Sequence, residues 1–183
     1  MPTLTVLICT HNRRPLLEKA LDSLDRCRMP AGWTVRIQVM ANACSDDTLD
    51  WLARRSGRLP LSVDHEPRPG KSNALNRALP AVSDDCIAFV DDDHRVDEGY
   101  IDAVCRAFDA RPDADLLCGR ILPDWDGSEP DWAHDTGPFR IYPLPVPRFD
   151  LGDAMTEVSP DRAIPGGGNL AIRTPWCARI GDF

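Results

Sequence analysis

The sequence has no excess of basic side chains. Such an excess is the usual signature of a nucleic-acid-binding surface. Lys and Arg together number 21 against 29 Asp and Glu, so the formal net charge at pH 7 is −8. We therefore expect no nucleic acid among the partners of this protein. The balance excludes little else, because an acidic protein can still place a few basic groups beside phosphates.

Long apolar runs are also missing. No stretch approaches the roughly 20 apolar residues that a membrane span needs, and the opening Met-Pro-Thr-Leu-Thr-Val lacks the pattern of a signal peptide. The seven cysteines are scattered and never spaced as C-x-x-C, so neither a disulfide framework nor a zinc site is expected. These absences favour a soluble, cytoplasmic domain and leave room for peripheral association with the inner face of a membrane.

Short apolar runs alternate with amphipathic stretches along the first two thirds of the chain. The predicted strands are Leu4–Cys9, Val35–Met40, Leu61–Val63, Cys86–Val90 and Ala114–Cys118. The predicted helices are Arg14–Cys27, Asp46–Arg55 with Ser45 as its N-cap, Lys71–Leu79, Val96–Ala110 and Trp176–Ile180. This alternation predicts an α/β protein with a mostly parallel sheet and helices on both faces.

Residues 123–165 break this pattern, because they carry eight prolines and no sustained period. The segment is either a long functional loop or an irregular subdomain. The glycines at 166–168 that follow lack the G-x-G-x-x-G spacing of a dinucleotide fingerprint, so we interpret them as a flexible loop where backbone passes close to a ligand.

Polar side chains follow each of the first four predicted strands. They are Thr10, His11, Asn12 and Arg13 after the first strand, Asn42 after the second, Arg68, Gly70 and Lys71 after the third, and Asp91, Asp92, Asp93 and His94 after the fourth. In an open parallel sheet, ligands bind beyond the carboxyl ends of the strands. The convergence predicts a binding site for a charged, nucleotide-like ligand at this edge.

The Asp91-Asp92-Asp93 triplet is the sharpest local signal. Side chains at positions i and i+2 of an extended chain share a face, so Asp91 and Asp93 can point the same way. Adjacent carboxylates repel one another, and Mg²⁺ or Mn²⁺ bound to them relieves that cost. The alternative is a solvated acidic turn. We favour a metal site because the triplet directly follows the apolar run 87–90, and His94 beside it can contact metal or phosphate.

Gly70-Lys71-Ser72 opens a predicted helix, where backbone N–H groups favour an anion and Arg68 and Lys71 add positive charge. The sequence is not a P-loop, because His65 stands where the first glycine of G-x-x-x-x-G-K-[ST] is required. Lys71 is therefore either a phosphate contact or a surface lysine in a first helical turn.

Five segments, taken together, resemble family 2 glycosyltransferases in the order in which that family has them. They are 5–13 (TVLICTHNR), 42–48 (NACSDDT), 70–76 (GKSNALN), 89–93 (FVDDD) and 168–173 (GNLAIR). Each is weak alone, apart from the D-x-D motif at the end of a strand, but five in order cover nearly the whole chain.

The resemblance implies a GT-A fold, a nucleoside-diphosphate sugar donor, and a Mg²⁺ or Mn²⁺ ion that bridges the diphosphate of the donor. It divides one domain, 1–183, into a nucleotide-sugar-binding half (1–94) and an acceptor-side half (95–183). The donor-nucleotide residues are then Thr10, His11, Asn12, Arg13, Asn42, Lys71, Asp91 and Asp92; the metal ligands are Asp93 and Asp91; and the donor-sugar or acceptor loop is Gly167, Gly168 and Asn169. Trp125 and Trp132 either stack on a sugar ring or anchor the proline-rich loop to the core.

The sequence departs from the family pattern in two places. Ala41 stands where an acidic residue commonly contacts a uracil ring, so uridine is not implied as the donor base. Ile180-Gly181-Asp182-Phe183 resembles the segment that precedes the catalytic base of the family, so we expect the general base beyond Phe183. On that expectation the sequence is truncated, and it binds the donor but transfers the sugar poorly to an unknown glycan, lipid or other acceptor, with inversion.

Two alternatives remain open from the sequence. A sugar-1-phosphate nucleotidyltransferase also combines an α/β sheet with a metal and a nucleotide, but its glycine-rich loop after the first strand is absent from Thr10-His11-Asn12-Arg13. The other is a non-catalytic fragment that still binds a nucleotide sugar.

Overall fold

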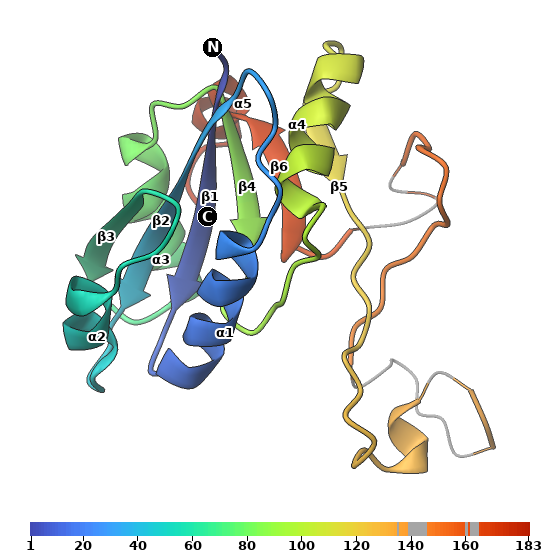
Figure 1. Ribbon diagram of the computed structural model, residues 1–183, viewed down its shortest axis with the longest axis horizontal. Coiled ribbons are helices and arrows are strands. Elements are labelled where there is room, and N and C mark those ends of the chain that lie inside the picture. Colours follow the sequence, from blue (N-terminus) through green and yellow to red (C-terminus); the bar gives the residue numbers. More distant parts are fainter. Residues whose placement is uncertain (135, 139–145, 160, 162–164) are drawn as a thin grey trace.

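The computed structural model describes residues 1–134, 136–138, 146–159, 161 and 165–183. Within these residues, six strands form one sheet in the order β3-β2-β1-β4-β6-β5 (Figure 1). The strands are β1 (Thr3–Thr10), β2 (Thr34–Asn42), β3 (Leu61–Glu66), β4 (Cys86–Val90), β5 (Leu116–Cys118) and β6 (Asn169–Arg173). β1 to β4 run parallel, whereas β6 is antiparallel to both β4 and β5, so the predicted mostly parallel sheet is confirmed.

Helices cover both faces of this sheet, as predicted. The helices are α1 (Arg14–Asp25), α2 (Thr48–Arg54), α3 (Lys71–Ala78), α4 (Tyr100–Ala110) and α5 (Thr174–Ile180), with short 3₁₀ turns η1 (Leu79–Ala81) and η2 (Asp131–Ala133). α1, α2 and α4 pack on one apolar core, and α3 and α5 pack on another. β1 contributes side chains to both cores because successive side chains point to opposite faces of the sheet. Leu4, Val6 and Ile8 pack in the first core, and Leu7 packs in the second.

α2 begins later than the sequence indicated, and the predicted N-cap role of Ser45 is wrong. The Asn12 side chain binds this stretch instead, because its Oδ1 accepts hydrogen bonds from the backbone N–H of Ser45 (2.7 Å) and of Asp46 (3.2 Å). The carboxylate of Asp46 in turn accepts from the N–H of Thr48 (3.1 Å), the first residue of α2. A contact from the loop after β1 therefore overrides the local capping preference.

α4 also begins later, at Tyr100 instead of Val96. The N–H of Val96 donates to Ser23 Oγ of α1 (3.1 Å), and the N–H of Gly99 donates to the Asp97 carboxylate (2.7 Å). These contacts hold the chain in a turn before the helix. At the other strand ends, β3 extends to Glu66 and β5 begins only at Leu116.

β6 is a strand that the sequence does not predict, since the glycines at 166–168 are interpreted as a flexible loop and residues 169–173 carry no strand signal of their own. Asn169–Arg173 fills the position between β4 and β5, with Ala171 opposite Ala88 on one side and Leu117 on the other. Its pairing partners are more than 50 residues away in sequence, so short-range patterning does not reveal the strand.

Residues 119–134 and 146–159 form an arm that leaves the β5 edge and extends away from the sheet (Figure 1). Its two sides are joined by a bridge between Ile121 and Phe149, and by Arg120 paired with Asp150 and Asp153, each at 2.7 Å. This is the described part of the predicted irregular segment; residues 135, 139–145, 160 and 162–164 lie outside the described residues.

The position of Trp132 contradicts one of the two interpretations of the tryptophans in the arm, namely that they anchor the proline-rich loop to the core. Trp132 lies in η2 at the far end of the arm and is 45% exposed, so it does not anchor the loop to the core (Figure 1). Trp125 is 38% exposed and lies 4.9 Å from the His134 ring. Contact of either indole with a sugar stays a prediction.

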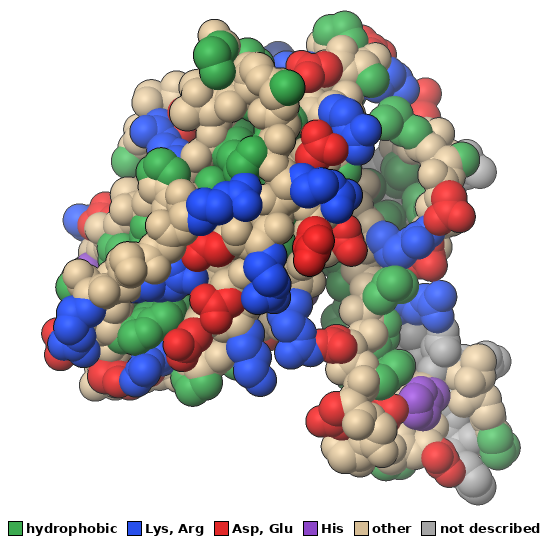
Figure 2. Space-filling view, viewed as in Figure 1, with side chains coloured by type: hydrophobic (Ala, Val, Ile, Leu, Met, Phe, Trp, Pro, Cys, Tyr) green, Lys and Arg blue, Asp and Glu red, His purple; other side chains and the backbone are tan. Residues whose placement is uncertain are grey.

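The surface carries both signs of charge in close alternation. Figure 2 shows acidic and basic side chains interspersed over the sheet-and-helix body, with no continuous basic patch on the face in view. None of the helices in the described ranges is long and apolar enough to cross a membrane.

Candidate functional site

The carboxyl ends of β1, β2 and β4 meet at a cleft of about 270 Å³. Its lining residues are Cys9, Thr10, His11, Arg13, Asn42, Lys71, Asp91, Asp92 and Asp93. Seven of the eight residues that we assigned to the donor nucleotide are among them, together with both predicted metal ligands; Asn12 is the exception. The parallel strands therefore bring together groups that are up to 83 residues apart in sequence.

Each carboxylate of the Asp triplet has a defined partner. Lys71 Nζ lies 2.5 Å from Asp91 Oδ1. Asp92 is buried and accepts a hydrogen bond from Thr10 Oγ1 at 2.7 Å. Arg13 Nη1 bridges the remaining pair, at 3.4 Å from Asp92 and 3.3 Å from Asp93. The three side chains line a cleft and carry basic partners, with Asp92 buried and the Asp93 side chain 48% exposed, and the choice between a metal site and a solvated acidic turn stays a prediction.

Three side chains here have the spacing of a metal site. Asp91, Asp93 and His94 each offer one ligand atom, and these atoms all lie within 4.8 Å of one another. Two carboxylates supply the hard oxygen ligands that Mg²⁺ and Mn²⁺ prefer. His94 is oriented by a second contact, Nδ1 to the carbonyl oxygen of Gly168 at 3.1 Å, as metal-binding imidazoles commonly are. These residues fit a divalent cation.

Gly168 sits against this trio, and the reason for a glycine is space. A Cβ at this position would lie 2.2 Å from His94 Cε1 and 2.6 Å from Asp91 Oδ2, so both side chains would have to shift to make room for it. The backbone here approaches the side chains of His94 and Asp91, and the approach of the glycine loop to a ligand stays a prediction. β6 thus closes the site from the far end of the chain.

The other two residues of that predicted loop face elsewhere. Asn169 donates from Nδ2 to the carbonyl of Arg120 (2.9 Å), so its side chain ties β6 to the chain after β5. Gly167 lines a second, more apolar cavity of about 310 Å³, which shares Cys9, Lys71 and Asp91 with the cleft. Lys71 and Asp91 therefore form the wall between the two spaces.

The loop after β1 is fixed by contacts to the end of β2. His11 Nδ1 lies 2.7 Å from the carbonyl oxygen of Asn42, and donation to that carbonyl sets the tautomer with the proton on Nδ1. Asn12 adopts a left-handed conformation, with φ of 51°, which its side-chain bonds to Ser45 and Asp46 support. Asn12 therefore positions the loop and does not line the cleft.

Asn42 braces the chain before α3. It is 5% exposed, and its Nδ2 donates to the carbonyls of Glu66 (3.2 Å) and Arg68 (2.7 Å) while its Oδ1 accepts from the N–H of Gly70 (2.8 Å). Both amide protons are thus used within the protein. Asn42 holds the start of α3, and Lys71 with it, at the edge of the cleft.

Glu66, to which the sequence assigns no role, supports the edge of the site through its backbone carbonyl, which accepts a hydrogen bond from Asn42. It is buried at the end of β3, and the neighbouring Arg68 binds both of its carboxylate oxygens, at 2.9 and 3.0 Å. These hydrogen bonds lower the pKa of Glu66 to about 2. The sequence predicts that Arg68 adds positive charge beside Lys71, but the Arg68 guanidinium pairs with the Glu66 carboxylate. The E-x-R spacing at the end of a strand was the available signal.

Cys9 is a further cleft residue to which the sequence assigns no role. It lines both the cleft and the apolar cavity. Burial raises the pKa of its thiol to about 11, with Lys71 opposing the rise. The thiol is therefore protonated at neutral pH and offers no strong nucleophile to a bound ligand.

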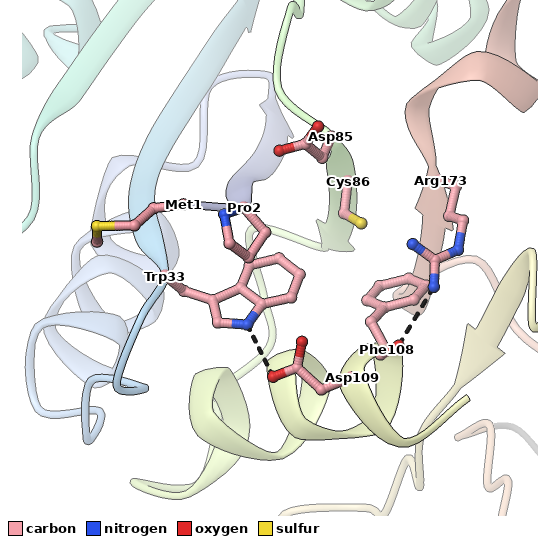
Figure 3. Close-up of a pocket in the computed structure, with 8 residues that line it drawn as sticks. All are labelled: Met1, Pro2, Trp33, Asp85, Cys86, Phe108, Asp109 and Arg173. Atoms are coloured by element: carbon pink, nitrogen blue, oxygen red, sulfur yellow. Dashed lines mark hydrogen bonds between the residues drawn. The ribbon is translucent and has the colours of Figure 1, made fainter. Parts of the chain in front are cut away.

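A third cavity, of about 420 Å³, opens at the amino end of the sheet (Figure 3). Its polar side chains have partners within the protein: Trp33 Nε1 donates to Asp109 (3.0 Å), and Arg173 donates to the carbonyls of Phe108, Arg111 and Ala114 (3.0–3.3 Å). None of the residues that the sequence assigned to a ligand lines this cavity.

Solved structures share this fold at low sequence identity. The mannosyltransferase PcManGT from Pyrobaculum calidifontis, in complex with GDP-Man and Mn²⁺, matches with a TM-score of 0.69 and 22% identity over 98% of this chain and 47% of its own. TarS 1–349 from S. aureus, also solved in complex with UDP-GlcNAc, matches with a TM-score of 0.58 and 22% identity over 70% of this chain. This chain covers 40% of TarS 1–349, so it spans less than half the length of either protein.

A direct search among curated proteins found no match. The architecture is the GT-A fold, as the resemblance in the sequence implied. The model of the family described as Glycosyl transferase family 2 matches residues 5–168, which contain all the residues that line the cleft, together with His94. The chain belongs to glycosyl transferase family 2.

Proposed function

We propose that this domain binds a nucleoside-diphosphate sugar together with a divalent cation, and that it serves the transfer of the sugar to an acceptor hydroxyl. The observation that carries the proposal is the meeting of Asp91, Asp93 and His94 with two cationic side chains, Arg13 and Lys71, in one cleft. Carboxylates suit a metal, and the cations suit a diphosphate. Two fold neighbours, solved in complex with GDP-Man and Mn²⁺ and with UDP-GlcNAc, add support.

The proposed role of each cleft residue follows from the chemistry of its side chain. Asp91, Asp93 and His94 would hold Mg²⁺ or Mn²⁺, which when bound neutralises negative charge on the departing nucleoside diphosphate. Arg13 and Lys71 would bind the diphosphate oxygens. Thr10 and His11 would lie along the nucleotide, with Asp92 held in place beneath them by its hydrogen bond from Thr10.

Base selection is expected to differ from that of a uridine-specific site that reads uracil with a carboxylate. Ala41 is fully buried and offers no side-chain acceptor, while Asn42 uses both amide protons inside the protein. We therefore propose that the base contacts backbone groups of the loops after β1 and β2, a mode that tolerates more than one base.

Inverting transfer requires a carboxylate that deprotonates the acceptor hydroxyl. Asp91, Asp92 and Asp93 are engaged with Lys71, Arg13 or Thr10, so we assign the base to none of them. Its position beyond Phe183 stays a prediction, as do the acceptor and the division of residues 1–183 into a donor half and an acceptor half.

A thermal-shift screen tests the proposal directly. UDP, GDP, CDP, ADP and dTDP are each added with and without Mn²⁺, because a ligand that binds the native state raises the unfolding temperature. We expect a rise that requires the metal and a diphosphate. Assays of nucleotide-sugar consumption with the best nucleotide then measure transfer. Absence of any metal-dependent rise with all five nucleotides would refute the proposal.

A further inference from the structure

The two cationic side chains of the cleft already form ion pairs with the carboxylates that are proposed to hold the metal. Lys71 Nζ lies 2.5 Å from Asp91, and Arg13 Nη1 lies 3.3 Å from Asp93. Three carboxylates against these two cations leave a single net negative charge at the cleft. The arrangement is close to neutral without any ligand.

A divalent ion cannot simply be added to this arrangement. A cation held by Asp91 would face the Lys71 ammonium across one carboxylate, and the two like charges would repel. With both present, the cleft would carry net positive charge. A diphosphate reverses that imbalance, because it brings negative charge and gives the ammonium new oxygen partners.

The side chain of Lys71 is free to change partners, whereas the backbone next to it is held in place. Its side chain is 58% exposed, at the wall between the cleft and the apolar cavity. The backbone N–H of Gly70, directly before it, is held by buried Asn42 (2.8 Å). An ammonium on a four-carbon stem is a mobile point charge, unlike the fixed fork of a guanidinium. A rotation of the side chain is enough to move the charge.

We propose that Lys71 is an exchangeable counter-ion, which pairs with Asp91 when the cleft is empty and transfers to the diphosphate when metal and donor enter. The inference rests on the proposed function and adds a coupling to it. Lys71 opposes the metal when the metal binds alone and favours the nucleotide when the metal is present. Metal and nucleotide therefore reinforce each other, in the range of roughly 5- to 150-fold that is typical of coupled sites.

Titration calorimetry of Mn²⁺ alone, and of UDP and GDP at saturating Mn²⁺, measures both halves of this exchange. Lys71→Met keeps the length of the side chain but removes its charge. We expect it to bind Mn²⁺ alone about tenfold more tightly, and nucleoside diphosphate about tenfold more weakly, than the parent. Lys71→Arg keeps the charge and should resemble the parent towards Mn²⁺ alone.

The matched control is Lys19→Met, which removes the other lysine of the chain from an exposed position on α1. It should bind Mn²⁺ and nucleotide as the parent does. Lys71→Gln should shift Mn²⁺ affinity in the same direction as Lys71→Met, and thermal unfolding of each variant checks that it folds.

The outcomes separate this inference from the function on which it rests. Unchanged or weaker Mn²⁺ binding by both Lys71→Met and Lys71→Gln overturns the counter-ion role, even if the parent binds nucleotide with Mn²⁺. Failure of the parent to bind any nucleoside diphosphate with Mn²⁺ overturns the proposed function. Tighter Mn²⁺ binding by the Lys71 variants would then still support the pairing of Lys71 against the metal.

Discussion

The two ends of the sheet use charge in opposite ways. At the carboxyl end, Lys71 and Arg13 pair with side-chain carboxylates that line an open cleft, and such partners can be exchanged for a ligand. At the amino end, Arg173 donates to three backbone carbonyls and lies over the Phe108 ring at 4.9 Å. Backbone carbonyls cannot leave without unfolding. The difference assigns recognition to one end and stability to the other.

The largest effect is expected at the carboxyl end. Asp93→Asn removes one metal-ligand charge, so we expect nucleoside-diphosphate affinity in the presence of Mn²⁺ to fall by about 100-fold, equivalent to about 2.8 kcal/mol. Calorimetry measures the loss. Asp115→Asn is the matched control, because it removes an exposed carboxylate just before β5, at the amino end. Equal losses in both variants would erase the distinction between the two ends.

The converse experiment targets Arg173, which caps the last turn of α4 by bonding the carbonyls of Phe108 and Arg111. Arg173→Met should lower the free energy of unfolding by about 2 kcal/mol, since several half-buried carbonyls lose their donor. Nucleotide affinity should stay at the parent value. Urea denaturation and calorimetry give the two readouts.

Arg106→Met provides the reference, because the Arg106 side chain is 70% exposed and makes an i,i+4 pair with Asp102. That variant should lose no more than about 0.5 kcal/mol. A large drop in nucleotide affinity for Arg173→Met at unchanged stability would contradict the assignment of the amino end to stability.

A smaller effect is expected where β6 meets the site. A Cβ in Gly168→Ala would displace the His94 ring and the Asp91 carboxylate, both side-chain ends that can move. We therefore expect roughly tenfold weaker Mn²⁺-dependent nucleotide binding, with a stability loss of about 1 kcal/mol or less. Gly167→Ala meets nothing within 4 Å and should have a much smaller effect. Similar losses from both alanines would mean that the close approach at Gly168 is unimportant.

The smallest effect concerns pH. The hydrogen bonds from Arg68 lower the pKa of Glu66 from its ordinary 4.5 to about 2. The folded state therefore binds this proton less readily than the unfolded state, so Glu66 contributes stability above pH 4.5 that is lost as the pH falls towards 2. Urea unfolding of the parent and of Glu66→Gln should converge across that window. A gap that stays constant from pH 6 to 2 would rule out this linkage.

The first half of the fold was predictable because its signals are local. Each apolar run of β1, β2 and β4 ends in polar residues, and parallel strands bring such ends to one edge. The same rule predicts that Thr10, Lys71 and Asp91 lie together, and the structure places all three around one cleft. Alternation of apolar runs and amphipathic stretches was enough for the class of fold and for the location of the site.

The contacts that refine the site were not predictable, because they join distant segments. His94 faces Gly168 across 74 residues, and nothing in either local sequence announces the pair. Asn12 displaced Ser45 from its expected capping role through a contact across 33 residues. β6 is not predictable for the same reason, because its five residues of mixed polarity form a strand only by pairing with the distant strands β4 and β5.

The position of β6 has a consequence for how the chain is made. Residues of β4 and β5 leave the ribosome well before Asn169–Arg173, yet these strands are joined only through the later one. Until it arrives, the apolar edge of β4 is an open template for other strands, the kind of exposed edge that promotes aggregation. A newly synthesised chain can thus assemble β1 to β4 early, before Asp91 and His94 gain Gly168 as a neighbour.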